Sequence, residues 1–272
     1  MPPPEEDPPI GTPLPPDQMP LSLTYLYYGC NDSGHWNICA IRADGTNPGT
    51  KITTRIGEDI WPSVSPDGRR IAFQCLQGVC LVDSNGMNLT TISDPLLGAP
   101  SWSPDGDRLV VRRLDGSIAT MDTDGGRVRQ VTSSGISPDW SPDGRRIAFI
   151  TLRDSPKWDI HVINVDGSGE TALTRGPAFD VSPEWSPDGS RIAFASDRGG
   201  GAINIWLMDA DGSNMVNLTN SAYSEGYPTW SPDGSRIAFR RSGWGIMMMD
   251  PDGSNEVTLA GVFPNYGLTW TP

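Results

Sequence analysis

Apolar and polar residues alternate along short segments of this chain, and the segments recur in a fixed order. Each copy starts with a turn such as Trp-Ser-Pro-Asp-Gly, continues with a run such as Arg-Ile-Ala-Phe, and reaches a second apolar run after a variable loop. This alternation has the two-residue period of a β-strand with one buried face. An Asp-Gly or Asn-Gly turn and a short final strand complete the copy. The pattern therefore predicts a meander of four antiparallel strands per copy.

The copies follow one another along almost the whole chain. The Ser or Thr of the turn stands at positions 65, 103, 141, 186, 231 and 271, so the spacing is 38 to 45 residues, as in an array of similar units. A proline lies two residues before the Trp position, inside the first strand of five units: Pro62, Pro100, Pro138, Pro183 and Pro228. Because proline cannot donate to a neighbouring strand, this strand must be an edge strand. Six such sheets with that edge facing a common axis form a six-bladed β-propeller.

The two ends of the chain complete one unit between them. The segments from Thr24, Trp36 and Lys51 supply only the second, third and fourth strands of a unit. The missing first strand is the C-terminal segment that ends at Trp270. We therefore expect an all-β fold in which residues 21–272 form a six-bladed β-propeller of four-stranded antiparallel blades. One C-terminal strand and three N-terminal strands would close the ring and leave no free edge.

The repeated phrase Trp-Ser-Pro-Asp-Gly-x-x-Ile-Ala-Phe, followed by an Asp-x-Asp-Gly turn, resembles the TolB-type, WD-like propeller repeat family. The resemblance covers residues 21–272, although Val64 replaces the Trp in one unit. The small α/β domain that precedes the propeller in TolB has no counterpart in this sequence. Because TolB is a periplasmic protein that engages partners through its propeller, the resemblance implies an extracytoplasmic, protein-binding propeller.

Charge and composition narrow the range of partners. The formal net charge of −13 argues against nucleic acid or an anionic membrane surface, because both favour clustered Lys and Arg. The sequence also has no stretch of about 18 to 20 apolar residues that would span a membrane. Residues 1–20 are Pro-rich and acidic, which predicts an extended linker. We expect this linker to tether a monomeric propeller to an upstream anchor or domain.

Four cysteines form two local pairs. Cys75 and Cys80 flank Leu-Gln-Gly-Val, and a two-residue turn at Gln77-Gly78 would place them opposite each other at about 4.5 Å, within disulfide range. Cys30 and Cys39 flank the corresponding loop of the preceding unit. Two disulfides would indicate an oxidising compartment. The alternatives are four reduced, buried cysteines or, less favoured, a zinc site with ligands from two units.

Few residues of this chain are suited to catalysis. It has two histidines, His35 and His161, and no Gly-x-Ser-x-Gly motif. Oligogalacturonide lyases share the repeat, but that family binds manganese through more histidines than this chain has. The Asp-x-Asp-Gly segments are similar to calcium loops, yet they lack the further ligands and fall where hairpin turns are needed. The Asp and Arg residues of the repeated turns recur in unit after unit, which indicates an architectural role.

Candidate binding residues lie where the units differ, at the start of each first strand. Acidic and amide side chains stand five residues before the Trp position in four units: Asp59, Asp180, Glu225 and Asn265. Aromatic residues lie close to them in the sequence: Trp61, Phe179, Tyr223, Tyr227, Phe263 and Tyr266. If these strands converge on the axis, the acids form a negative mouth for a cation or a basic peptide. The aromatic residues would then anchor the partner. The alternative is that the acids are solvated and the aromatic residues pack between blades.

The leading hypothesis is a non-enzymatic binding module that recognises a peptide or protein at this mouth. The first alternative is a calcium-dependent propeller hydrolase, with Asp59, Asp180, Glu225 and Asn265 around the ion; calcium is thus the one cofactor to test. The second alternative is a carbohydrate-binding propeller that uses the aromatic loop residues. No residue is assigned as catalytic, because no general base with a tuned pKa is evident.

Overall fold

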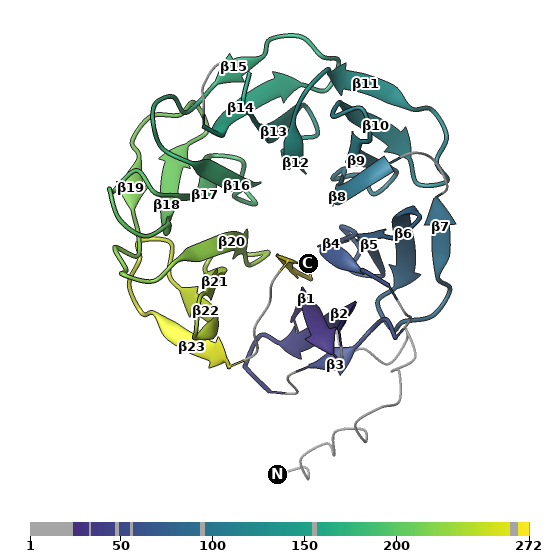
Figure 1. The fold of residues 1–272 in the computed structure, drawn as a ribbon, viewed down its shortest axis with the longest axis horizontal. Helices are drawn as coiled ribbons and strands as arrows, with labels where there is room; N and C mark the ends of the chain where they lie inside the picture. Colours follow the sequence, from purple (N-terminus) through teal and green to yellow (C-terminus); the bar gives the residue numbers. More distant parts are fainter. Residues whose placement is uncertain are drawn as a thin grey trace.

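The protein forms a ring of β-sheets around a central axis (Figure 1). The structure is a computed structural model that describes residues 24–32, 34–46, 49–54, 57–92, 96–153, 157–261 and 266–271. These residues form six sheets of four antiparallel strands each, which confirms the predicted all-β, six-bladed propeller. Within these ranges, no helix has the length and apolar character needed to cross a membrane. The expected linker, residues 1–20, lies outside the described residues.

Each blade is given below from the axis outward, and blades are numbered in chain order. Blade 1 contains β24 (Tyr266–Trp270), β1 (Tyr25–Asp32), β2 (His35–Arg42) and β3 (Thr50–Lys51). Blade 2 contains β4 (Ile60–Val64), β5 (Arg70–Cys75), β6 (Gly78–Asp83) and β7 (Thr90–Ile92). Blade 3 contains β8 (Leu96–Trp102), β9 (Arg108–Arg113), β10 (Ile118–Asp122) and β11 (Arg129–Thr132).

The remaining blades repeat the same order from the axis to the rim. Blade 4 contains β12 (Ile136–Trp140), β13 (Arg146–Thr151), β14 (Asp159–Asn164) and β15 (Thr171–Ala172). Blade 5 contains β16 (Asp180–Trp185), β17 (Arg191–Ser196), β18 (Asn204–Asp209) and β19 (Val216–Asn217). Blade 6 contains β20 (Glu225–Trp230), β21 (Ile237–Arg241), β22 (Gly245–Met249) and β23 (Val257–Ala260).

Blade 1 joins the two ends of the chain, as the sequence predicts. The C-terminal strand β24 pairs with β1, with Trp270 opposite Leu26. Beyond this ladder, the backbone N–H of Tyr25 donates to Oγ1 of Thr271 at 2.8 Å. One C-terminal strand and three N-terminal strands therefore close the ring, and the innermost strand of each blade is an edge strand that faces the axis.

A bulge interrupts the inner strands at the residue before the proline. In β4, Ile60 pairs with Gln74 but Ser63 pairs with Ala72, so the inner strand holds one extra residue at this point. The residue before the proline has a positive φ in five blades: Trp61 (52°), Ala99 (50°), Ser137 (50°), Ser182 (53°) and Tyr227 (53°). Left-handed backbone is unfavourable for residues with a Cβ, so the ring imposes this conformation on them. The bulges bend the inner strands where they line the axis.

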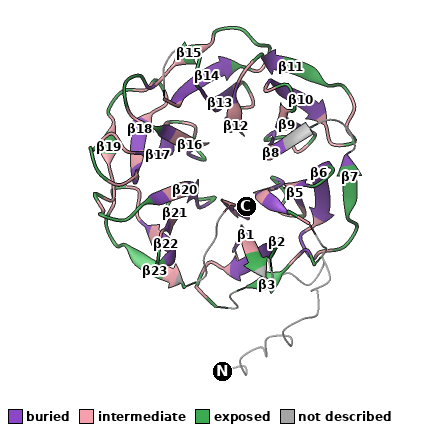
Figure 2. Ribbon diagram, in the orientation of Figure 1, coloured by how far each residue is buried: buried purple, intermediate pink, exposed green. Residues whose placement is uncertain are grey.

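The hydrophobic core lies between neighbouring blades. The Phe of the repeated Ile-Ala-Phe run is fully buried in four blades: Phe73, Phe149, Phe194 and Phe239. Figure 2 shows that buried residues follow the inner and middle strands, whereas the outer strands and loops are more exposed. In four blades the Arg of the turn lies over the Trp of the next blade, with Arg70 at 4.8 Å from the Trp102 ring and Arg146 at 4.6 Å from the Trp185 ring. These cation–π contacts confirm that the repeated Arg is architectural.

The repeated Ser-Pro-Asp-Gly segment is a hydrogen-bonded turn, as predicted. In blade 6, Oγ of Ser231 donates to Asp233 at 2.6 Å, and the N–H of Ser235 donates to the same carboxylate at 3.0 Å. The N–H of Arg236 donates back to Oγ of Ser231 at 2.9 Å. The hydrogen bond from Ser231 is the main cause that lowers the pKa of Asp233 to about 2. The turn aspartates are therefore ionised acceptors that hold the first hairpin of blades 2 to 6.

Both expected disulfides are present, but the predicted turn in blade 2 is wrong. Cys30 bonds to Cys39 and Cys75 bonds to Cys80, with Cα–Cα distances of 5.8 and 5.9 Å. The strand register places Cys75 opposite Gly78, so the two-residue turn is Leu76-Gln77 and not Gln77-Gly78. The bonded cysteines are therefore diagonal neighbours across the hairpin, a spacing that disulfide geometry also accepts.

Candidate functional site

The axis of the ring holds a cavity of about 280 Å³ that all six inner strands line. Five prolines of the inner strands form part of its wall: Pro62, Pro100, Pro138, Pro183 and Pro228. The bulged residues, most of the polar residues that follow the prolines, and core residues such as Trp102 and Trp140 form the rest. Because the blades share one architecture, chemical differences along this wall come from those two variable positions.

Two carboxylates stand in the wall and link neighbouring blades. Asp139 of β12 accepts a hydrogen bond from Oγ of Ser101 at 3.1 Å and another from the N–H of Trp185 at 2.9 Å. Glu184 of β16 accepts a hydrogen bond from Oγ1 of Thr229 at 2.8 Å and another from the N–H of Trp230 at 3.0 Å. Each acid therefore connects its own inner strand to the inner strand of the next blade.

The pKa values of these two carboxyl groups are raised. Enclosure in the channel wall raises the pKa of Asp139 to about 6. Enclosure, and then the charge of nearby Asp139, raise the pKa of Glu184 well above its usual range. Among the described residues, no arginine or lysine offsets the pKa shift of either group. The channel thus holds two neighbouring acids without a compensating cation, an arrangement that favours proton uptake or a bound positive charge.

Aromatic side chains occupy the opposite part of the channel mouth. The ring of Tyr266 in β24 packs edge-to-face on Trp61 of β4 at 5.7 Å and on Trp36 of β2 at 4.9 Å. Tyr227 of β20 lines the channel with Trp61. All four of these side chains are partly exposed. Around the ring, β24 and β4 lie across the axis from β12 and β16, and β20 lies between β16 and β24 (Figure 1). The mouth is therefore aromatic on one side and acidic on the other.

The acids that the sequence proposes for the mouth lie inside the blades. Asp59 is 1% exposed, and its backbone N–H donates to the carbonyl oxygen of Trp36 at 3.0 Å. Asp180 is also 1% exposed, and it accepts hydrogen bonds from Ser196 at 2.5 Å and Arg198 at 2.7 Å. Asn265 falls outside the described residues. The structure therefore does not bring these side chains together in the channel, and ligand binding by them stays a prediction.

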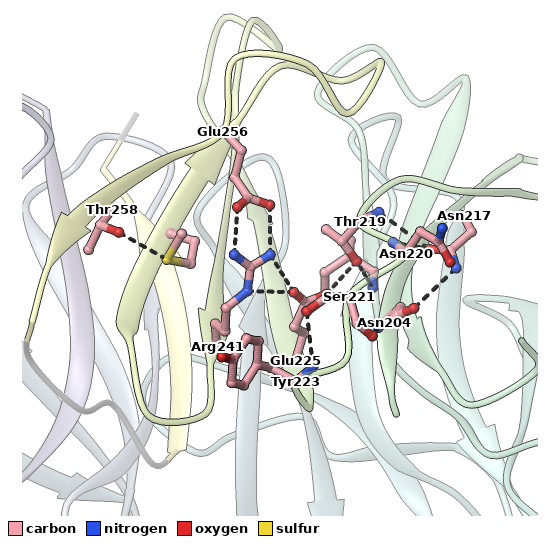
Figure 3. A network of polar contacts seen from close by, with 12 residues as sticks. Asn204, Asn217, Thr219, Asn220, Ser221, Tyr223, Glu225, Arg241, Glu256 and Thr258 are labelled. Carbon is pink, nitrogen blue, oxygen red and sulfur yellow. Dashed lines mark hydrogen bonds and ion pairs between the residues drawn. The ribbon is translucent and has the colours of Figure 1, made fainter. Parts of the chain in front are cut away.

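Glu225, the remaining predicted acid, belongs to a buried ion-pair network (Figure 3). Its carboxylate accepts a hydrogen bond from Nε of Arg241 at 2.7 Å and another from Oγ1 of Thr219. The same guanidinium binds Glu256 through both terminal nitrogens, at 2.5 and 2.6 Å. Burial raises the pKa of Glu225 despite these hydrogen bonds. This network supports blade 6 and leaves Glu225 with both oxygens engaged.

Two other predicted aromatic residues, Phe179 and Tyr223, lie on loops outside the channel. Phe179 is 37% exposed, and Nζ of Lys157 lies 3.8 Å from its ring centroid. Tyr223 contacts Trp244 on the loops of blades 5 and 6. Phe263 falls outside the described residues. Of the predicted aromatic set, Trp61 and Tyr227 therefore line the channel, and Tyr266 packs on Trp61 beside it.

Two of the predicted calcium ligands, Asp180 and Glu225, do not fit a calcium ion as they are arranged. Calcium takes six to eight oxygen ligands, mostly carboxylates and carbonyls that are free to turn toward it. Asp180 and Glu225 each direct oxygens at an arginine, a cation that would repel the ion. Among the described residues, no group of three or more His, Cys, Asp or Glu side chains is arranged to hold a metal ion.

Sequence reasoning missed Asp139 and Glu184, the two acids of the channel wall. Both stand directly before the Trp of the repeated turn, where the other inner strands carry Ser63, Ser101, Thr229 and Thr269. The replacement of a small hydroxyl residue by an acid at one repeat position was a visible signal. The position adjoins the repeated turn, where residues that recur in unit after unit indicate architecture and not a site.

The acid pair predicts an unusual dependence of stability on pH. Asp139 has a folded pKa of about 6, above its ordinary value of 3.8, so between these values only the folded state holds the proton. Stability should therefore fall as pH rises from about 4 to above 6. The turn aspartates act in the opposite direction: the lowered pKa of Asp188, about 2, makes stability fall as pH drops below about 4. We expect urea midpoints to peak between about pH 4 and 5.

The double variant Asp139→Asn/Glu184→Gln tests the origin of the fall above pH 4. It should flatten that limb of the profile, because neither amide titrates. The exposed turn variant Asp252→Asn should leave the same limb unchanged, since the lowered pKa of Asp252 acts only at acidic pH. A wild-type profile that rises steadily from pH 4 to 7 would contradict the assignment.

Comparisons with known proteins agree with this architecture. An uncharacterized protein of Agrobacterium fabrum, Atu1656, is 33% identical over 106 residues, which cover 33% of this chain and 36% of that protein. The match thus spans about a third of that relative's length. TolB from Acinetobacter baumannii superposes with a TM-score of 0.75 and 22% identity, over 92% of this chain and 67% of that one. A putative TolB from Agrobacterium tumefaciens superposes with a TM-score of 0.71 and 22% identity, over 92% of this chain and 98% of that one. A family model described as the TolB beta propeller domain matches residues 78–272, more than half of the chain, and the chain therefore belongs to that family.

Proposed function

We propose that this propeller is a non-enzymatic, extracytoplasmic module that binds an extended peptide segment of a protein partner at the channel mouth. A basic side chain of the peptide would enter the cavity toward Asp139 and Glu184. Apolar residues on either side of it would pack against Trp61, Tyr227 and Tyr266. Membership of the TolB propeller family supports a protein-binding role in general. The binding site at the channel mouth and the basic peptide ligand are proposed from the residues of the channel wall.

The observation that carries the proposal is the pair of uncompensated acids opposite an aromatic wall. A lysine or arginine side chain would supply one positive charge to the pair Asp139 and Glu184 and offset part of the cost of their enclosure. The cavity of about 280 Å³ has room for one such side chain. Tyr and Trp are the residues that most often anchor a partner in the centre of an interface. A single cavity therefore offers both charge and apolar contact.

Two disulfides support an extracytoplasmic location. Cys30–Cys39 joins β1 to β2 in blade 1, and Cys75–Cys80 joins β5 to β6 in blade 2. Disulfides persist in oxidising compartments and are rare in the cytosol. The location proposed is therefore periplasmic, cell-surface or secreted.

Peptide selection tests the proposed ligand class. A random peptide library displayed on phage would be selected on the immobilised full chain at pH 7.5. We expect the recovered peptides to be enriched in Lys or Arg next to apolar residues. Their affinity should fall at least tenfold for Asp139→Asn/Glu184→Gln and for Trp61→Ala, as measured by fluorescence anisotropy.

An acid on a turn outside the channel provides the matched control. Asp211→Asn removes one negative charge from the exposed turn between β18 and β19, so it tests for general charge attraction. Its affinity for the selected peptides should stay within twofold of wild type. Peptides without basic enrichment, or equal losses for the channel and turn variants, would refute the proposed site.

A further inference from the structure

An exposed aromatic pair lies on the loops of blades 5 and 6, outside the channel. Tyr223 is in the loop between β19 and β20, and Trp244 is in the hairpin between β21 and β22. Each side chain is 48% exposed. Their ring centroids are 5.8 Å apart, and the planes meet edge-to-face at 70°. Two large aromatic side chains held together at the surface indicate a contact site for a ligand.

Amide side chains fix the loop that carries Tyr223 (Figure 3). Nδ2 of Asn204 donates to the carbonyl oxygen of Ser221 at 2.9 Å. Oδ1 of Asn217 accepts from the N–H of Asn220 at 3.1 Å. The N–H of Tyr223 then donates to Oγ of Ser221 at 3.0 Å. These hydrogen bonds define the path of the loop as it approaches β20.

The loop of Tyr223 and the hairpin of Trp244 share one support. The N–H of Ser242 donates to the carbonyl oxygen of Ser224 at 2.9 Å, which joins the two segments. The N–H of Trp244 donates to the carbonyl oxygen of Arg241 at 3.1 Å, and Arg241 is held by the buried acids of blade 6. The aromatic pair is therefore arranged before any ligand arrives, which lowers the entropic cost of binding.

The polar groups beside the pair carry no charge. The two loops contribute Asn220, Ser221, Ser224 and Ser242, whose groups donate and accept hydrogen bonds. The charged residues at the loop ends, Glu225 and Arg241, are 4% and 9% exposed and bind each other. The two loops therefore offer a ligand a pair of aromatic rings together with neutral hydrogen-bonding side chains.

We propose that Tyr223 and Trp244 form a stacking subsite for a neutral saccharide. A pyranose ring has an apolar face of C–H groups and an edge of hydroxyl groups. The C–H groups carry partial positive charge and fit the negative face of an aromatic ring. The hydroxyl groups match the amide and hydroxyl side chains at the rim. This subsite is separate from the proposed peptide site in the channel and does not depend on it.

Exposed leucines occupy the hairpin tips of three other blades. The tips of the hairpins in blades 2, 3 and 4 carry exposed leucines: Leu76 (73%), Leu114 (58%) and Leu152 (45%). A leucine offers apolar surface but no flat π face. The fold therefore accepts a leucine at this hairpin tip, and it does not require the tryptophan that blade 6 carries there.

Affinity electrophoresis of the full chain tests the subsite. Native gels would contain hydroxyethyl cellulose, laminarin, galactomannan or dextran as neutral probes, and polygalacturonate as an anionic one. We expect retardation in at least one neutral gel. Trp244→Ala should weaken the apparent affinity about tenfold, the effect of losing one aromatic contact, and Trp244→Phe should restore most of it.

Variants elsewhere on the ring separate this proposal from the peptide proposal. Leu114→Ala alters the matching hairpin tip of blade 3, and Trp61→Ala alters the channel mouth; both should be retarded like wild type. Far-UV circular dichroism and the melting temperature of Trp244→Ala should match wild type, because this side chain is on the surface. The subsite is refuted if no neutral gel retards the protein, if only polygalacturonate does, or if Trp244→Ala is retarded as strongly as wild type. It is also refuted if Trp244→Ala loses only the selected peptides.

Discussion

Replacing Arg241 by alanine is expected to lower the free energy of unfolding by about 3 kcal/mol, because it leaves a buried carboxylate without its partner. Arg241 is 9% exposed and Glu225 is 4% exposed, so water cannot take the place of the guanidinium. The same guanidinium also holds Glu256 through two hydrogen bonds. Urea unfolding at pH 7, followed by tryptophan fluorescence, measures the change.

A surface ion pair of the same blade is the matched control. Arg236 binds Asp250 at 2.7 Å, but its side chain is 38% exposed. Solvent-exposed pairs contribute little, so Arg236→Ala should cost less than about 1 kcal/mol. The double variant Arg241→Met/Glu225→Leu should recover part of the loss, since it removes both buried charges together. Equal costs for Arg241→Ala and Arg236→Ala would contradict the role of the buried network.

The buried ion pair of Glu225 explains why the sequence predicted only part of the channel mouth correctly. The position five residues before the Trp does recur at the start of the inner strands, as expected. There, however, Asp180 meets Arg198 from the loop after β17, and Glu225 meets Arg241 at the end of β21. The repeat spacing contains no information on which arginine side chain reaches which acid. A pattern of acids along the chain therefore could not distinguish an open anionic mouth from buried ion pairs.

The fold itself was predictable because its signals are local and repeated. The Ser-Pro-Asp-Gly turns, the alternating runs and the prolines of the inner strands each specify one step of a blade, and their recurrence specifies the ring. The incomplete unit at each end specified the closure through β24 and β1. These features depend on backbone geometry and on residues a few positions apart, which a sequence displays directly.

Features that the closed ring imposes were not predictable. The residue before each inner-strand proline has a positive φ, including Trp61 and Tyr227, although a residue before proline ordinarily favours extended backbone. The bulge brings these aromatic side chains to the channel wall. The sequence predicts only that they lie near the mouth. Cys75 and Cys80 similarly bond across a diagonal, because the turn of their hairpin lies one residue earlier than its glycine suggests.

The turn glycines between the third and fourth strands provide the second large expected effect. Gly253 has a φ of 84°, and a Cβ built on it would lie 2.6 Å from the carbonyl oxygen of Leu218 in the adjacent blade. Backbone of a neighbouring blade cannot move aside without separating the blades, so Gly253→Ala should cost about 3 kcal/mol. Gly212 is similarly close to the carbonyl oxygen of Leu173, at 2.9 Å, which makes this contact a recurrent joint of the ring.

Gly116 separates the steric part of this cost from the conformational part. It has the same φ of 84°, but a Cβ on it would have no neighbour within 4 Å. Gly116→Ala should therefore cost only about 1 kcal/mol, the price of left-handed backbone for alanine. Urea unfolding of both variants under the same conditions measures the difference, which we expect to be about 2 kcal/mol. If the two alanine variants lose equal stability, close packing of the turn on the next blade does not stabilise the ring, and the glycine serves the turn alone.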